Sequence, residues 1–116
     1  MALRVLAVGD PAVYAYTDER LDILAGYRRL TGATVEFNIV PWDEYGATLF
    51  AAAAEENPPF DVVMVAGHLW LAQFVENGWL ASLEGLTPLE SPEYESQDIL
   101  PAIHREMRYR DVPYLV

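Results

Sequence analysis

LRVLAVGDP, at residues 3–11, joins a run of leucines and valines to a Gly-Asp-Pro turn. A short apolar run of this kind predicts a buried strand, and the turn residues predict where that strand ends. TVEFNIV, at residues 34–40, alternates apolar and polar side chains, which predicts a second strand that is solvated on one face or lies near a sheet edge. DVVMV, at residues 61–65, predicts a third strand, because it is continuous, β-branched and preceded by a turn.

Apolar residues at helical spacing predict helices between these strands and after the third. The predicted helices cover residues 18–32, 42–56 and 68–77, with Leu21, Tyr27 and Leu30 on the apolar stripe of the first. Strands that alternate with helices pair in parallel through right-handed crossovers. The expected fold class is therefore α/β, with a doubly wound, mostly parallel sheet.

The remainder of the chain predicts less regular structure. We expect an extended segment at 79–83, an acidic surface loop at 84–96, a helix at 97–107 with a proline in its first turn, and a strand at 112–116. A strand at the last residue is an unusual way to finish a domain, because termini normally fray outside the last element. We therefore expect residues 1–116 to be part of a longer protein.

Composition excludes several classes of function. The hydrophobic fraction of 53% excludes a disordered acidic tail, and the net charge of −11 argues against nucleic acid and anionic membranes as partners. Lysine and cysteine are both absent, so there is no Walker or Schiff-base lysine and no thiol nucleophile or thiolate metal site. His68 and His104 are the only histidines, and His104 is expected to be solvated. We expect no catalytic residues, no metal and no cofactor.

The loops that follow the strands are the expected ligand-binding segments, because ligands bind beyond the carboxyl ends of the strands of a doubly wound sheet. Aromatic or imidazole side chains gather in these segments: Tyr14, Tyr16, Trp42, Tyr45, His68 and Trp70. Aromatic rings with polar tips suit stacking on sugar rings, although some of them are expected to be core residues instead. Asp10 is open to two interpretations, a group presented to a ligand or a turn residue.

The order of these pieces resembles the amino-terminal part of an extracellular solute-binding protein of a bacterial ABC transporter, most of all the sugar-binding family. The resemblance begins with the strand and polar loop at 5–16 and includes the valine-rich strand at 34–40. The other phrases that together carry it are YRRLTG (27–32), WDEY (42–45), PFDVV (59–63), GWLASL (78–83) and VPYLV (112–116).

The resemblance implies a binding function rather than an enzyme. Residues 1–116 would be the amino-terminal part of the first of two lobes, an incomplete lobe of the periplasmic-binding-protein-like (type II) fold. The solute would be a carbohydrate or similar small molecule, delivered to an ABC permease in the membrane. The family's ligand-binding positions correspond here to Asp10, Tyr14, Trp42, Asp43, Gly67 and His68.

The resemblance also implies a location for the protein and an incomplete sheet in residues 1–116. The protein would be periplasmic or extracellular, lipid-anchored or soluble, although the first six residues are too short for a secretory signal. The family's sheet includes a strand that returns from the second lobe, between the third and last strands predicted here. Unpaired backbone in a sheet is costly, so we expect residues 1–116 alone to self-associate or to borrow a strand.

Two rival functions have weaker support from the sequence. One is a degenerate receiver-like signalling domain, which has a similar length and acidity. Its first strand and acidic loop resemble residues 4–10. A phosphorylatable receiver is excluded, because it needs an aspartate near Ala66 and a lysine, and the chain has neither. Part of an enzyme such as a glycosyltransferase has less support, since no catalytic constellation is visible.

Overall fold

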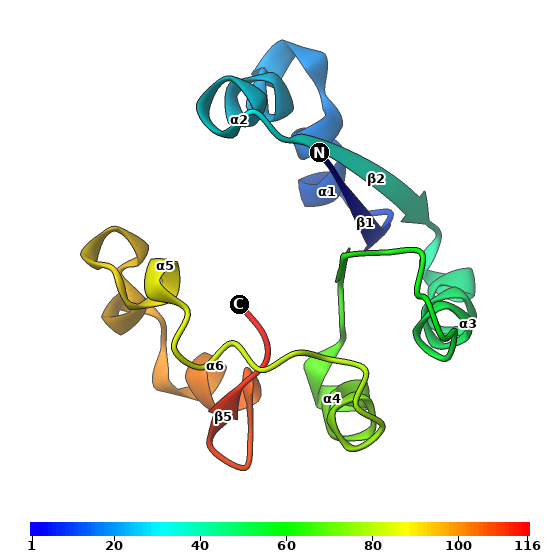
Figure 1. Ribbon diagram of the computed structural model, residues 1–116, viewed down its shortest axis with the longest axis vertical. Coiled ribbons are helices and arrows are strands. Elements are labelled where there is room, and N and C mark those ends of the chain that lie inside the picture. The colour runs from blue at the N-terminus through cyan, green and yellow to red at the C-terminus, as the bar shows by residue number, and fades with distance from the viewer. The chain divides into compact units, whose positions relative to one another are not determined.

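Three parallel strands form the sheet of the first of two units, Met1–Met64, in a computed structural model that describes residues 1–116. The strands are β1 (Ala2–Val8), β2 (Thr34–Val40) and β3 (Val62–Val63), in the spatial order β2-β1-β3. β1 pairs with β2 along its whole length, from Ala2 opposite Thr34 to Val8 opposite Val40. The parallel sheet predicted from the sequence is therefore confirmed (Figure 1).

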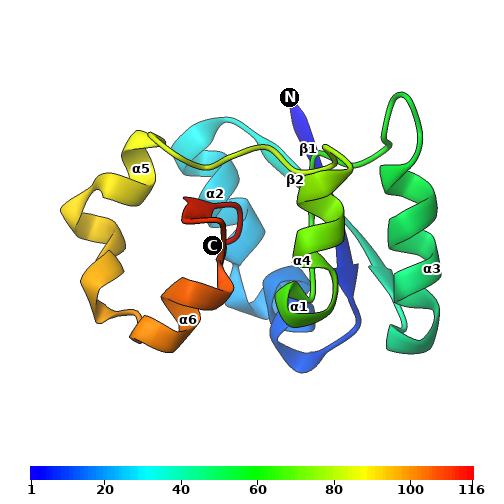
Figure 2. The same ribbon diagram turned by 90° about the horizontal axis from the view of Figure 1, so that it is seen from below.

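The helices of this unit lie on both faces of the sheet. α1 (Pro11–Thr17), a 3₁₀ turn (Glu19–Leu21) and α2 (Ile23–Thr31) connect β1 to β2, and α3 (Trp42–Ala53) connects β2 to β3. The chain moves from β1 to one neighbour and then back past β1 to the other. Right-handed crossovers in opposite directions place α1 and α2 on one face and α3 on the other, as Figure 2 shows. This arrangement confirms the doubly wound topology.

Local chemistry shifts several helix boundaries from their predicted places. Residues 9–16 were expected to form a loop, but Asp10 caps a helix there, because its Oδ1 accepts a hydrogen bond of 2.9 Å from the Val13 amide. Asp18 caps only the 3₁₀ turn, so α2 begins later than predicted. Gly32, with φ of 75°, ends α2 as expected, and α3 ends at Ala53 rather than near residue 56.

The core of the first unit lies around the central strand. Leu6 and Ala7 of β1 are fully buried, as are Tyr45 and Leu49 of α3, and Val13, Ala33 and Ala52 complete the buried set. The apolar stripe of the first predicted helix does not enter the core, since α2 contains no buried residue and Leu30 is 88% exposed. Helical spacing identified the helix, but burial depends on what packs against it.

β3 is shorter than the predicted strand at 61–65, and one ion pair attaches its beginning to β1. Asp61 accepts from the Arg4 backbone amide at 2.9 Å and from the Arg4 side chain at 3.2 and 3.0 Å, while the Asp61 amide donates to the Arg4 carbonyl at 2.8 Å. These hydrogen bonds from Arg4 lower the pKa of Asp61 to about 2. The carboxylate is therefore stabilised only in the folded chain.

The Asp61–Arg4 pair predicts a pH-dependent contribution to stability. The folded-state pKa of Asp61, about 2, lies below the unfolded value. The contribution is therefore fully present above roughly pH 4 and is lost as the pH falls through the folded pKa. We expect the gap in urea midpoint between wild type and Asp61→Asn to close over this range. Arg4→Gln should show the same convergence, and a gap that stays constant down to pH 2 would contradict the pairing.

The second unit, Val65–Val116, contains short helices and one hairpin. It comprises α4 (Gly67–Glu76), α5 (Thr87–Glu90), 3₁₀ turns at Pro92–Tyr94 and Ser96–Asp98, α6 (Pro101–Glu106), β4 (Arg108–Tyr109) and β5 (Val112–Pro113). Leu71 and Phe74 of α4 are buried, and the Trp79 ring meets the Phe74 ring edge-on at 5.1 Å. No helix of the chain has both the length and the apolarity needed to cross a membrane.

Three predictions for this unit were wrong in detail. The expected loop at 84–96 contains α5 and a 3₁₀ turn, and the helix expected from residue 97 begins at Pro101. The expected strand at 112–116 pairs only over Val112–Pro113, and it pairs antiparallel with β4. Arg110 and Asp111 adopt positive φ values of 49° and 65°, the conformation of a tight hairpin turn, and so bring β5 back onto β4.

Candidate functional site

The carboxyl ends of the three strands meet at one edge of the first unit's sheet. The Gly9 amide donates to the Val40 carbonyl at 3.0 Å, so the exits from β1 and β2 are joined directly. On the other side, the Met64 amide donates to the Leu6 carbonyl at 3.0 Å. The chain leaves β1 toward β2, while β3 lies on the opposite side of β1. The boundary between β1 and β3 is thus the switch point, where doubly wound sheets bind ligands.

Trp42 and Asp43 begin α3 directly after β2, at this edge. The Trp42 ring lies nearly parallel to the Tyr45 ring, at a centroid distance of 6.4 Å and an interplanar angle of 13°. Trp42 is nevertheless 56% exposed, and Asp43 is exposed beside it. An indole ring supported from one side, next to a carboxylate, suits a ligand with a flat apolar face and hydroxyl groups.

Tyr14 lies at the end of β1, although in α1 rather than in the predicted loop. It is 56% exposed, and its hydroxyl lies over the backbone of Gly9, where an added methyl group would come within 3.0 Å of Tyr14 Oη. The hydrogen-only side chain of Gly9 therefore permits this close approach. Tyr16 instead stacks on Phe37 of β2, with ring centroids 6.1 Å apart.

Asp10 has a structural role in the observed fold. Its Oδ1 accepts from the Val13 amide at 2.9 Å and so caps α1. The turn-forming interpretation of Asp10 therefore has direct support, and a role in binding a ligand stays a prediction.

Tyr45 is one of the gathered aromatic residues that belong to the core, as expected for some of them. It is 1% exposed, and its hydroxyl donates toward two carbonyl oxygens, that of Met64 at 2.6 Å and that of Leu6 at 3.2 Å. Burial raises the pKa of the Tyr45 phenol to about 12. The hydroxyl is therefore protonated, and able to donate, throughout the neutral pH range.

Gly67 and His68 belong to the second unit, at the beginning of α4. His68 is exposed. Gly67 packs closely, since a methyl group added to it would lie 2.8 Å from Leu115 Cδ1 and 3.3 Å from the Glu106 carbonyl oxygen. This contact within the second unit explains a glycine at position 67 without a ligand, and ligand binding by either residue stays a prediction.

Gly67→Ala is expected to destabilise the protein by about 1–3 kcal/mol, the usual cost of forcing a methyl group into a packed site. The carbonyl of Glu106 is backbone and cannot move aside cheaply. Urea denaturation checks this, with Gly26→Ala as the control, because a methyl group at Gly26 meets only Arg29 Nη2, at 3.6 Å. Alanine within helix α2 should be neutral or stabilising, and equal effects of the two variants would refute the packing argument.

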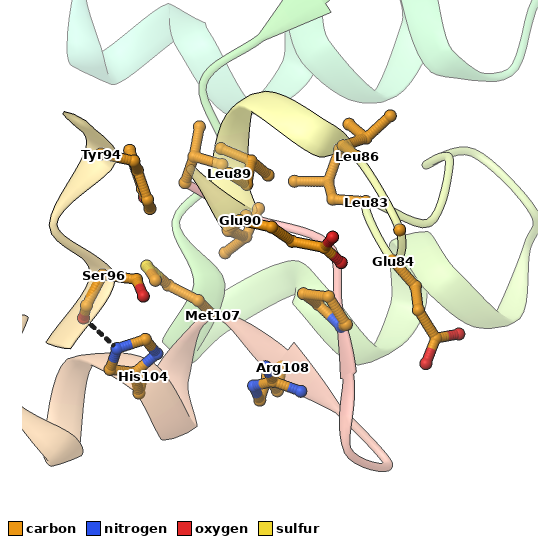
Figure 3. A pocket seen from close by; sticks show the side chains of 14 residues that line it. Leu83, Glu84, Leu86, Leu89, Glu90, Tyr94, Ser96, His104, Met107 and Arg108 are labelled. Carbon is orange, nitrogen blue, oxygen red and sulfur yellow. Dashed lines mark hydrogen bonds between the residues drawn. The ribbon is translucent and has the colours of Figure 1, made fainter. Parts of the chain in front are cut away.

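A cavity of about 370 Å³ lies within the second unit (Figure 3). Leu83, Leu89 and Met107 contribute apolar surface, and His104 lines it with Nε2 2.7 Å from the Ser96 carbonyl oxygen. His104 was expected to be solvated, and the structure shows it half-buried instead. The spacing of His104 and Met107 on one helix face is a signal that could have revealed this. None of the predicted ligand-binding residues lines the cavity.

Comparison with known proteins gives one family and one fold. The sequence model described as bacterial extracellular solute-binding protein matches residues 10–116. The crystal structure of UspC from M. tuberculosis is similar with a TM-score of 0.75 and 18% identity, over 98% of this chain and 25% of that one. An ABC transporter solute-binding protein from Thermotoga lettingae TMO, bound with α-D-tagatose, is similar with a TM-score of 0.75 and 23% identity, over 97% of this chain and 27% of that one.

The chain thus spans about a quarter of the length of these two solved structures. At identities of 18% and 23%, the likeness establishes the fold. No match to the chain is found among curated proteins.

Proposed function

Since the chain belongs to the family of bacterial extracellular solute-binding proteins, we propose that it is part of the substrate-binding component of an ABC importer. In this proposal, residues 1–116 are the amino-terminal part of the first of two lobes. The protein binds a small solute without changing it chemically and delivers it to a permease in the membrane. The observation that carries the proposal is the exposed Trp42 ring at the carboxyl edge of the sheet, supported by buried Tyr45.

The proposed solute class is carbohydrate. Sugar rings present flat C–H faces that pack on aromatic rings, and Trp42 and Tyr14 offer two such rings at one edge of the sheet. The Asp43 carboxylate, exposed beside Trp42, can accept hydrogen bonds from sugar hydroxyls. The solute-binding protein of Thermotoga lettingae, similar in fold, is bound with α-D-tagatose. Asp10, Gly67 and His68 remain proposed ligand contacts from the sequence resemblance.

The family to which the chain belongs is described as extracellular, which supports a location outside the cytoplasm. We propose a periplasmic or extracellular location, with either a lipid anchor or a soluble form. Self-association of residues 1–116 alone stays a prediction. The receiver-like alternative has no support from the structure, because the positions after β3 are Met64, Val65 and Ala66 rather than an acidic phosphoacceptor.

A thermal-shift screen of the protein at its full natural length tests the proposed function. The probes are D-tagatose, D-glucose, D-galactose, maltose and trehalose, with glycine and putrescine as probes of other solute classes. A ligand that binds only the native state raises the melting temperature by mass action, so one sugar at about a hundred times its Kd should add roughly 2.7 kcal/mol. A shift with glycine or putrescine but with no sugar would overturn the carbohydrate assignment.

A further inference from the structure

We propose that Tyr45 is a positioning residue, whose hydroxyl fixes the end of β3 beside β1 at the switch point of the sheet. The inference concerns the first unit alone, and its relevance to solute binding rests on the proposed function. Its ring stacks on the Trp42 ring, and its hydroxyl acts on the backbone of Leu6 and Met64.

The hydrogen-bond geometry carries this inference. Tyr45 Oη lies 2.6 Å from the Met64 carbonyl oxygen and 3.2 Å from the Leu6 carbonyl oxygen. The Met64 amide donates to the same Leu6 carbonyl at 3.0 Å. The hydroxyl therefore closes a small network between the end of β1 and the residue that follows β3. Phenylalanine would fill the same space and make neither bond.

The shortness of β3 explains why the Tyr45 hydroxyl is needed to hold its end. Only Val62 and Val63 form the strand, opposite Val5 and Leu6, whereas β2 pairs with β1 over seven positions. The Asp61–Arg4 pair holds the beginning of β3. At its end, the Tyr45 hydroxyl adds a donor from a helix on one face of the sheet. A core tyrosine that served only to fill space would not need a hydroxyl aimed at two main-chain carbonyls.

Tyr45 also connects this backbone to the proposed ligand surface. Its ring supports the Trp42 ring at 6.4 Å, nearly parallel, while its hydroxyl holds Met64. One buried side chain thus sets both the ring offered at the end of β2 and the backbone at the end of β3. Loss of the hydroxyl should therefore loosen the backbone at the end of β3 and leave the Trp42 ring in place.

Hydrogen exchange on Tyr45→Phe, in the protein at its full natural length, tests the positioning role without any ligand. We expect the Met64 amide to exchange about three- to tenfold faster, because a net hydrogen-bond contribution of this order is lost. The Gly9 amide, bonded to Val40 on the other side of β1, is the internal control and should keep its rate. Equal acceleration at both amides, or none at Met64, would overturn the proposal.

A matched variant separates positioning from general destabilisation. Leu49→Val shortens a fully buried side chain of the same helix and removes no hydrogen bond. If the two variants lose the same global stability, Leu49→Val should leave the ratio of the Met64 and Gly9 amide exchange rates unchanged. An equal rise of this ratio in Tyr45→Phe and Leu49→Val would also overturn the proposal. The affinity for the sugar with the largest shift in the screen should fall in Tyr45→Phe only. If no sugar binds wild type, the proposed carbohydrate function fails while the exchange result still decides the role of Tyr45.

Discussion

Phe74→Ala is expected to destabilise the protein by about 3–5 kcal/mol, the range for removing a buried aromatic side chain. Phe74 is fully buried in α4, and its ring is the edge-on partner of Trp79 at 5.1 Å. The substitution removes the transfer free energy of the ring, leaves a cavity in its place, and loses the contact with Trp79. Urea denaturation of the full-length protein, followed by Trp fluorescence and circular dichroism, measures the change.

Leu69→Ala is the matched control for Phe74→Ala. Leu69 lies on the same helix but is 56% exposed, so its truncation should change stability by about 0.5 kcal/mol or less. If both variants lost the same stability, burial in the second unit would not be the source of the effect. A loss below about 1 kcal/mol for Phe74→Ala would contradict the assigned core.

Trp42→Ala is expected to weaken sugar binding by about 2 kcal/mol, roughly a thirtyfold rise in Kd, if the indole is the stacking surface. The melting temperature should change little, because more than half of the Trp42 surface faces solvent. Trp42→Phe keeps a flat ring and should recover part of the affinity. Isothermal titration with the sugar that gives the largest shift in the thermal screen provides the measurement.

Tyr27→Ala separates this effect from a general loss of surface aromatics. Tyr27 is an exposed aromatic residue of α2, which precedes the amino end of β2 and therefore lies away from the carboxyl edge. Its replacement should leave sugar affinity within about twofold of wild type. Unchanged affinity in Trp42→Ala would remove Trp42 from the proposed site, and an equal loss in Tyr27→Ala would show that the effect is indirect.

The strands β1 and β2 were predictable almost to the residue. The apolar run at 3–8 and the alternation at 34–40 are local patterns. Gly9 follows the first and Pro41 the second, and glycine and proline both interrupt strands through their backbone conformations. The parallel order followed, because a helix between two strands leaves few ways to pair them. These predictions needed no knowledge of distant contacts.

Some of the predictions that failed depend on tertiary contacts, whereas the shifted helix boundaries depend on local capping. DVVMV has the composition of a long strand, yet only Val62 and Val63 pair, because strand length depends on a partner. Tyr45 and Trp42 belong to one helix turn and look alike in the sequence, but one is buried and the other exposed. The turn at Arg110 and Asp111 reverses the last strand, which no apolar pattern signals.

The amino-acid sequence alone determined the alternation of strands and helices, the parallel sheet and the resemblance to solute-binding proteins. These depend on periodicity and on turn residues, which act over a few neighbouring positions. The tertiary structure decided which aromatic rings are core and which face solvent, and it brought Tyr45 to the carbonyls of Leu6 and Met64. Tyr45 is separated from Leu6 by 39 positions and from Met64 by 19. Its burial and its hydrogen bonds to them therefore arise only when the whole sheet has formed.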